Sequence, residues 1–449
     1  MINSITLNKS DYTICATRKD NLLSLVDYYF VIVVYLFPNM FLGFVYRKWF
    51  VDERLIEIIL PLPLLFLYRD NEENKTTNPP GWTPLRILCI YIISQFLITL
   101  ALCEDSFIDI IKTMRWNIPF PISAYCILHA AIRMKYSKLE KIFSIFMNLF
   151  FLQCILCFIS AMINYDFFIN RLDYEGYADL LLNERVHRGN TLAFPRHFLA
   201  LFTVATITAL SSRRLKIFAR FIVALCVPII MTRRMLSICT ILECLIIWGL
   251  SSIYLKTRKV GYIIYIALFI FTIMIINPKL ENQILLKITP DHIEKGDSFV
   301  KNYGTYNYRL TIFNDSVSQV EGRHFFGNHY IRDEVGKFSE GYTYVLGEDS
   351  PIAAIIFCEG FVGIILRLAP YLFFLAWAFR KIKDGDEFEK KLSIIFLAYT
   401  LSQIPSYIQS MILTRFDYNY CIFALLYIIN GKRKSIQNSI PSLESVAAQ

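Results

Sequence analysis

Long apolar runs alternate with short polar segments along almost the whole chain. Most runs are about 17–25 residues long, the length that an α-helix needs to cross the hydrocarbon core of a bilayer. The pattern therefore predicts an all-α polytopic membrane protein with about twelve transmembrane helices. The expected spans are 22–46, 49–68, 84–103, 118–134, 142–163, 191–210, 215–231, 235–255, 260–276, 361–379, 391–413 and 418–430.

Two polar intervals are too long to be simple turns between spans. The longer, 277–350, carries eight Lys/Arg, eleven Asp/Glu and three His, and it lies between the ninth and tenth spans. The shorter, 164–190, has mixed charges and no metal-ligand spacing. We expect 1–449 to be a single membrane domain, with 277–350 as a large, mainly helical loop insertion that carries part of an active site.

The second span differs from the others because Pro61 and Pro63 interrupt it and charged residues crowd its start. Proline removes a backbone donor and clashes with the preceding helical turn. We therefore expect a short or bent helix in this span.

Lysine and arginine are divided unevenly between the two sides of the predicted bundle. With twelve spans, both termini lie on the same side. The loops and termini on that side hold 25 Lys/Arg, and the short loops opposite hold 11. Short loops rich in Lys and Arg stay in the cytoplasm. We therefore expect cytoplasmic termini and two outward-facing polar intervals. The net charge of +9 follows from this topology and does not indicate a nucleic-acid partner.

Several arginines stand in or beside predicted spans, where a charge is costly and often functional. Arg196, the pair Arg233 and Arg234, and Arg309 come from three separate elements, and all are predicted at the outer face. Each one alone could be an interfacial side chain whose charged head reaches water. Guanidinium groups bind phosphate bidentately, so the set together favours a phosphate or pyrophosphate site. Arg367, inside the tenth span, is a further unusual charge.

The end of the long polar interval predicts the start of a helix. Ser350 is a favourable N-cap and Pro351 a favourable first helical residue. Glu348 and Asp349 precede them, and two roles are open for this pair. In the first, they stabilise the helix start through its dipole. In the second, one of them is the base that activates an acceptor hydroxyl. Gly360 is expected to break this helix before the tenth span.

The long interval also contains His324, His329 and Tyr330. A structural zinc site needs four ligands at closer spacing. We therefore interpret the histidines as loop residues or substrate contacts, and as substrate contacts they would bind a glycan together with Tyr330. The sequence contains no P-loop or H-E-x-x-H motif.

The order of these parts resembles the O-antigen polymerase and O-antigen ligase superfamily of bacterial envelope enzymes. The resemblance covers about 191–379. It consists of an Arg-bearing turn (Thr232-Arg233-Arg234), a further hairpin, an outward loop with an Arg-led helix (309–320) and a Phe326-Gly327 turn, and a short helix ending in Glu359-Gly360.

The resemblance implies a site on the periplasmic face of the bacterial inner membrane. Arg233 or Arg234, together with Arg309, would bind the pyrophosphate of an undecaprenyl-linked glycan and stabilise it as it departs. Glu348 or Asp349 would deprotonate the hydroxyl of a lipid-linked repeat unit, onto which the growing glycan is transferred. No metal or cofactor is implied. The expected partners are the lipid-linked oligosaccharide and membrane lipid, and a chain-length regulator protein is a further candidate partner.

Two other functions stay open. Ligases of this superfamily carry a histidine before the short outer helix, where this chain has Glu348-Asp349-Ser350, and the difference favours a polymerase. A ligase would use lipid A–core as its acceptor. A lipid-linked oligosaccharide flippase would also have about twelve spans, but such transporters tend to show paired broken helices in matching halves, and the sequence shows no such symmetry.

Overall fold

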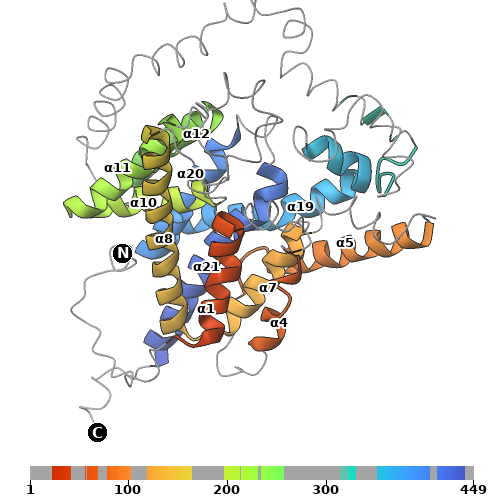
Figure 1. The fold of residues 1–449 in the computed structure, drawn as a ribbon, viewed down its shortest axis with the longest axis horizontal. Helices are drawn as coiled ribbons and strands as arrows, with labels where there is room; N and C mark the ends of the chain where they lie inside the picture. Colours follow the sequence, from red (N-terminus) through yellow and green to blue (C-terminus); the bar gives the residue numbers. More distant parts are fainter. Residues whose placement is uncertain are drawn as a thin grey trace, which may run out of the picture.

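The computed structural model describes residues 23–41, 56, 58–68, 78–102, 119–163, 197–212, 214–230, 234–256, 314, 317–318, 320, 322–329, 351–404 and 412–439. Within these ranges every regular element is a helix, and the helices pack against one another (Figure 1). Four of them are long and apolar enough to cross a membrane. They are Trp82–Leu102, Tyr136–Ile159, Leu236–Tyr254 and Ile355–Asp384. The prediction of a helical protein with membrane-spanning character is therefore confirmed.

The helices follow the apolar runs of the sequence. They are α1 (Leu25–Val31), its π-helical continuation η3 (Ile32–Phe41), α4 (Leu64–Leu67), α5 (Trp82–Leu102), α7 (Pro119–Arg133), α8 (Tyr136–Ile163), α10 (Phe198–Ser211), α11 (Leu215–Ile230), α12 (Arg234–Tyr254), α19 (Pro351–Asp384), α20 (Glu387–Ser402) and α21 (Ile412–Ser439). The ninth predicted span, 260–276, and the interval 164–190 lie outside the described residues.

Two predicted spans differ from the observed helices in an informative way. The described part of the second span is helical at 56 and 58–59, forms a turn at 60–63 and continues as the four-residue α4, in keeping with its two prolines. The eleventh span, predicted as 391–413, is too long, because α20 ends at Ser402 and Leu413 already belongs to α21. Pro405 follows this end closely in the sequence, and a proline lacks the N–H that would continue the helical hydrogen bonds.

Helices α19 and α20 pack antiparallel through aromatic rings. The rings of Phe374 and Phe396 have centroids 4.4 Å apart. Further along α19, Lys381 forms an ion pair with Glu389 at 3.3 Å, near the start of α20. Rising residue numbers in one helix therefore meet falling numbers in the other.

Helix α21 returns antiparallel to α20 on the same core. Phe396 meets the ring of Phe423 edge-on at 5.2 Å, and Glu389 pairs with Lys434 at 2.7 Å. Acidic residues at the start of α20 thus face basic residues near the end of α21. We call this end of the bundle the Asp384 end, and the opposite end of α19 the Gly360 end.

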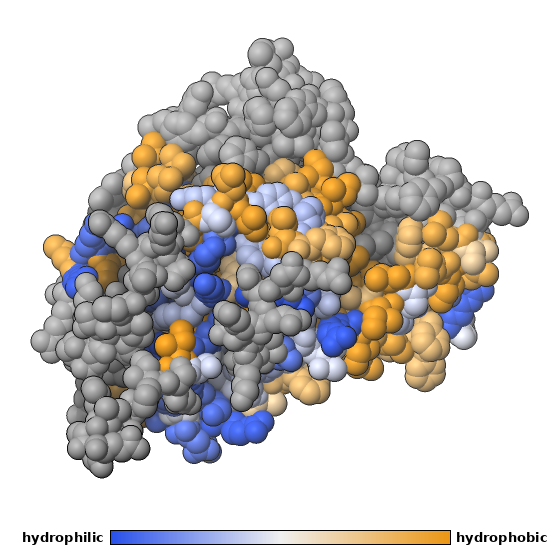
Figure 2. Space-filling model, turned by 90° about the horizontal axis from the view of Figure 1, so that it is seen from below, coloured by the Kyte–Doolittle hydropathy of each residue, from blue (hydrophilic) through white to orange (hydrophobic). Residues whose placement is uncertain are grey.

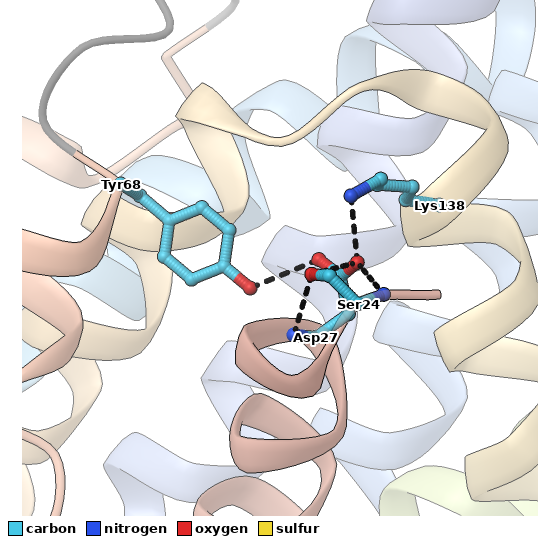
Figure 3. Close-up of polar contacts among 4 residues, drawn as sticks. All are labelled: Ser24, Asp27, Tyr68 and Lys138. Atoms are coloured by element: carbon cyan, nitrogen blue, oxygen red, sulfur yellow. Dashed lines mark hydrogen bonds and ion pairs between the residues drawn. The ribbon is translucent and has the colours of Figure 1, made fainter. Parts of the chain in front are cut away.

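A buried carboxylate joins three helices at the Asp384 end (Figure 3). Asp27 of α1 is 1% exposed. Its Oδ2 accepts hydrogen bonds from Lys138 Nζ of α8 and from Ser24 Oγ, each at 2.7 Å. Its Oδ1 accepts one from Tyr68 Oη, just after α4, at 3.1 Å. Because a buried charge is stable only when paired and hydrogen-bonded, this carboxylate holds α1, α4 and α8 together.

Loss of the Tyr68 hydroxyl tests this junction. Tyr68→Phe should lower the free energy of unfolding by about 0.5–1.5 kcal/mol, because Asp27 loses one hydrogen bond while its ion pair remains. Tyr28→Phe is the matched control, since Tyr28 is 51% exposed. Thermal unfolding of the detergent-solubilised protein measures both variants, and equal melting temperatures for the two would contradict the role of Asp27.

Candidate functional site

Helix α19 is broken at Gly360, as the sequence predicted. Gly360 has φ 65° and ψ −165°, which lies outside the helical region. Such a break interrupts the i to i−4 hydrogen bonds and leaves backbone groups without helical partners. In the apolar part of a membrane protein those groups must find partners within the protein.

A turn from the long polar interval provides these partners. This turn, 322–329, lies beside the break. His324 O and Phe325 O accept hydrogen bonds from the amides of Phe361 and Val362, at 2.9 and 3.1 Å. The turn also donates a bond of 2.8 Å from Asn328 N to Phe357 O. The turn therefore replaces the missing helical partners on both sides of Gly360.

The two backbones approach so closely that both contacting positions must be glycine. A Cβ on Gly327 would lie 2.6 Å from the carbonyl carbon of Cys358 and 2.7 Å from the amide of Gly360. A Cβ on Gly360 would lie 2.6 Å from the amide of Gly327. Both glycines also have positive φ, a conformation that side chains disfavour. The local sequence thus fixes where the turn docks.

A bidentate ion pair lies just below the break. Arg367 donates from Nε to Glu359 Oε2 at 2.9 Å and from Nη2 to Oε1 at 2.6 Å. Both side chains are at most 2% exposed. This geometry does not fit a role for Arg367 in an open anion site. Its charge is instead balanced by a carboxylate eight residues earlier on the same helix.

Helix α5 packs beside the break, antiparallel to α19. Its first residues lie near Pro370, since a Cβ on Gly81 would be 2.7 Å from the Cα of Pro370. Nearly three turns further on, Tyr91 Oη donates to Glu359 O at 2.8 Å. Gln95 Oε1 lies 2.5 Å from His329 Nδ1 in the turn. Tyr91 and Gln95 thus connect α5 to both parts of the junction.

Sequence reasoning missed these α5 residues, although a signal was present. Tyr91, Gln95 and Thr99 recur every four residues in an otherwise apolar span, so they share one helix face. Gln95 and Thr99 are buried. A polar stripe on a predicted membrane helix indicates a face that contacts protein and not lipid.

A second polar group occurs where α12 meets α20. Glu243 is fully buried, and its Oε1 accepts hydrogen bonds from Ser402 Oγ at 3.1 Å and from Gln403 Nε2 at 3.5 Å. Phe374 of α19 contacts Phe396 of α20. Arg367 stands seven residues before Phe374, and Gln403 stands seven residues after Phe396. Each therefore lies about 10 Å from that contact, towards the Gly360 end. The two polar groups therefore lie at a similar height. Together we call them the polar layer.

The imidazole of His329 is neutral near pH 7. Burial is the main cause that lowers the pKa of His329, and the positive charge of Arg323 lowers it further. A neutral ring with its proton on Nδ1 donates to Gln95 Oε1, whereas a charged ring would bring a cation into a partly apolar junction.

Acid should loosen the docked turn. Above pH 6.5, the ordinary pKa of histidine, His329 is neutral in both the folded and the unfolded chain. Below it the unfolded chain takes up the proton first, so stability falls as the pH drops. The melting temperature should therefore decrease more between pH 7 and pH 5 in the parent than in His329→Gln. Identical decreases would show that His329 does not titrate in this way.

The predicted site residues are only partly covered by the described structure. His324 and His329 both lie in the docked turn, and the His324 ring is 6.4 Å from the ring of Phe361. Arg234 begins α12, and its side chain is outside the description. The other predicted site residues lie outside the described residues; they are Arg196, Arg233, Arg309, Tyr330, Glu348 and Asp349.

The described part of the site contains hydrogen-bonding groups, and its buried ion pair carries no net charge. Glu359 and Arg367 neutralise each other. The neutral ring of His329 and the exposed Arg323 belong to the turn itself. A scan against models of known protein families finds none that matches the chain, and a search of curated proteins finds no match.

Proposed function

We propose that this protein is a polymerase of surface polysaccharide, of the O-antigen type. It transfers a growing glycan from undecaprenyl pyrophosphate onto a lipid-linked repeat unit at the outer face of the bacterial inner membrane. The observation that carries the proposal is the docking of the turn 322–329 on the broken helix α19. This contact ties the long polar interval, with its predicted arginine and carboxylate groups, to a rigid membrane helix.

The sequence around α19 supports the same site. Pro351 begins the helix, and Glu348 and Asp349 stand three and two residues before it in the sequence. From Pro351 to Gly360 the helix is about 14 Å long. A carboxylate at the start of this helix would therefore be separated by about this length from the docked turn, which carries His324 and His329.

The distribution of charge supports the orientation. Lys432 of α21 donates to Ile132 O at 2.7 Å, and Lys434 pairs with Asp386 at 2.9 Å, both at the Asp384 end. Lys432 also donates to Met134 O, four residues before Lys138, so Lys138 lies at this end as well. Lys and Arg accumulate on the cytoplasmic side of membrane proteins. The Gly360 end, with the polar layer, then faces outward.

The reaction needs a base and a cationic site for the leaving group. Glu348 or Asp349 takes the proton of the acceptor hydroxyl as its oxygen bonds to the anomeric carbon of the donor glycan. The bond from that carbon to the pyrophosphate oxygen breaks, and negative charge develops on the pyrophosphate. Arg309 and Arg234 or Arg233, assisted by Arg196, stabilise this charge.

Substitution of the arginines tests the proposal. Arg309→Ala and Arg234→Ala should leave the protein in the membrane but reduce the surface glycan to single repeat units, because the departing pyrophosphate loses its countercharge. Arg380→Ala is the control, since Arg380 is exposed near the Asp384 end of α19. Glycan ladders on a gel and protein levels in the membrane are measured. Ladders of normal length in both arginine variants would refute the assignment.

The carboxylates are tested separately. Glu348→Gln or Asp349→Asn should lower turnover more than substrate binding, because a general base acts in the transition state. The assay follows extension of lipid-linked repeat units by the reconstituted protein. Unchanged turnover in both variants would leave the two residues with a role at the helix start only.

A further inference from the structure

The docked turn exposes two phenylalanines beside a membrane helix. Phe325 is 71% exposed and Phe326 is 57% exposed, although the backbone of the same turn is hydrogen-bonded to α19. Large apolar side chains exposed next to each other mark a binding surface more often than a single one does. A partner must therefore be found for this pair.

The position of the turn along α19 restricts that partner. The atoms of α19 that bond to it belong to Phe357, Phe361 and Val362, and all three residues lie within the candidate span Ile355–Asp384. From residue 361 to residue 384 the helix is about 36 Å long, slightly more than a hydrocarbon core of about 30 Å. The break at Gly360, and the turn bonded to it, thus come at one edge of the apolar layer.

Apolar side chains continue from the phenylalanine pair along the neighbouring helices. Phe361 and Ile365 are exposed on the first turns of α19 after the break. Helix α5, whose Gln95 contacts the turn, exposes an apolar stripe of its own. This stripe consists of Ile90, Ile93 and Leu97. Figure 2 shows hydrophobic surface over the end of the molecule that α5 forms.

The flanking residues fit a boundary between lipid and water. Arg323 precedes the pair by two positions and is exposed. Arginine places its apolar stem along lipid and its charged head at the phosphate level. His324 lies between Arg323 and Phe325, and its ring faces Phe361. A cation followed by two exposed aromatic rings is the order expected where a chain enters the headgroup region.

We propose that the turn 322–329 is a membrane-interface anchor, whose Phe325 and Phe326 side chains insert between lipid headgroups and acyl chains. The long polar interval is then held by the membrane as well as by α19. The anchor fixes the distance of the attached polar segment from the lipid surface. The anchor does not depend on which reaction is catalysed at the outer face of the membrane.

Photo-cross-linking in proteoliposomes tests the anchor. The full-length protein carries p-benzoyl-phenylalanine at position 325 or 326, a conservative change from phenylalanine. The same group at Phe373, on the exposed apolar side of α19, is the lipid-facing control. The group at Asp384, which is exposed at the end of α19, is the water-facing control.

Irradiation followed by mass spectrometry of the intact protein gives the result. Phospholipid adducts at positions 325 and 326 should form in yields within about threefold of those at position 373, and at least tenfold above those at position 384. Yields at 325 and 326 equal to the water-facing control would overturn the proposal. Adducts to added glycan or to another protein, in place of lipid, would also overturn it and would identify a stacking surface or a protein interface.

Discussion

Replacing Gly360 with alanine is expected to lower the free energy of unfolding by at least about 3 kcal/mol. The φ and ψ angles of Gly360, 65° and −165°, fall in a region that residues with a Cβ hardly occupy. The new Cβ would also lie 2.6 Å from the amide of Gly327 and from the carbonyl carbon of Phe325. Both neighbours are backbone atoms held by hydrogen bonds, so the turn must undock to relieve the overlap.

The helix α12 offers a matched control for this change. A Cβ on Gly249 would meet nothing within 4 Å. Gly249→Ala should therefore be neutral, or stabilise the helix by about 0.5–1 kcal/mol. Thermal unfolding and protease sensitivity of the purified protein compare the two variants. If Gly360→Ala melted as Gly249→Ala does, the close approach between the turn and α19 would be wrong.

Breaking the buried ion pair should have an effect of similar size. Arg367→Met leaves the carboxylate of Glu359 buried and without its bidentate partner, which should cost about 3–5 kcal/mol. The double variant Glu359→Leu/Arg367→Met removes both charges and should recover most of that loss, because an apolar pair of similar volume is often as stable as a buried ion pair. The pair therefore gives a double-mutant cycle with a large interaction energy.

Arg380 provides the control on the same helix. Arg380 is exposed, so Arg380→Met should change the free energy of unfolding by less than about 0.5 kcal/mol. Chemical or thermal unfolding of the parent, Arg367→Met, Glu359→Leu and the double variant measures the cycle. Strictly additive losses in the double variant would mean that Glu359 and Arg367 do not stabilise each other.

Much of the fold follows from the length and spacing of apolar runs. Helices α5, α8 and α12 lie on the spans predicted at 84–103, 142–163 and 235–255, because an uninterrupted apolar run has few alternatives to a helix in lipid. Boundaries were less predictable. The end of α20 at Ser402 and the start of α21 at Ile412 depend on packing and on a nearby proline, which hydropathy alone does not weigh.

The candidate site was less predictable than the fold. The break at Gly360 could be anticipated, since a glycine interrupts an otherwise apolar helix. The pairing of Arg367 with Glu359 could not be anticipated, because Glu359 stands eight residues away and the break changes which helix faces meet. The contacts of Tyr91 and Gln95 join segments more than two hundred residues apart, and a single sequence does not encode such a pairing visibly.

The glycan profile of a strain that lacks the gene tests the central claim most directly. If the protein polymerises lipid-linked repeat units, the strain should carry surface glycans of one repeat unit, and the gene supplied in trans should restore the long ladder. A strain with its normal ladder would contradict the account. So would a surface without any repeat unit, as loss of a ligase gives, or repeat units held inside the cell, as loss of a flippase gives.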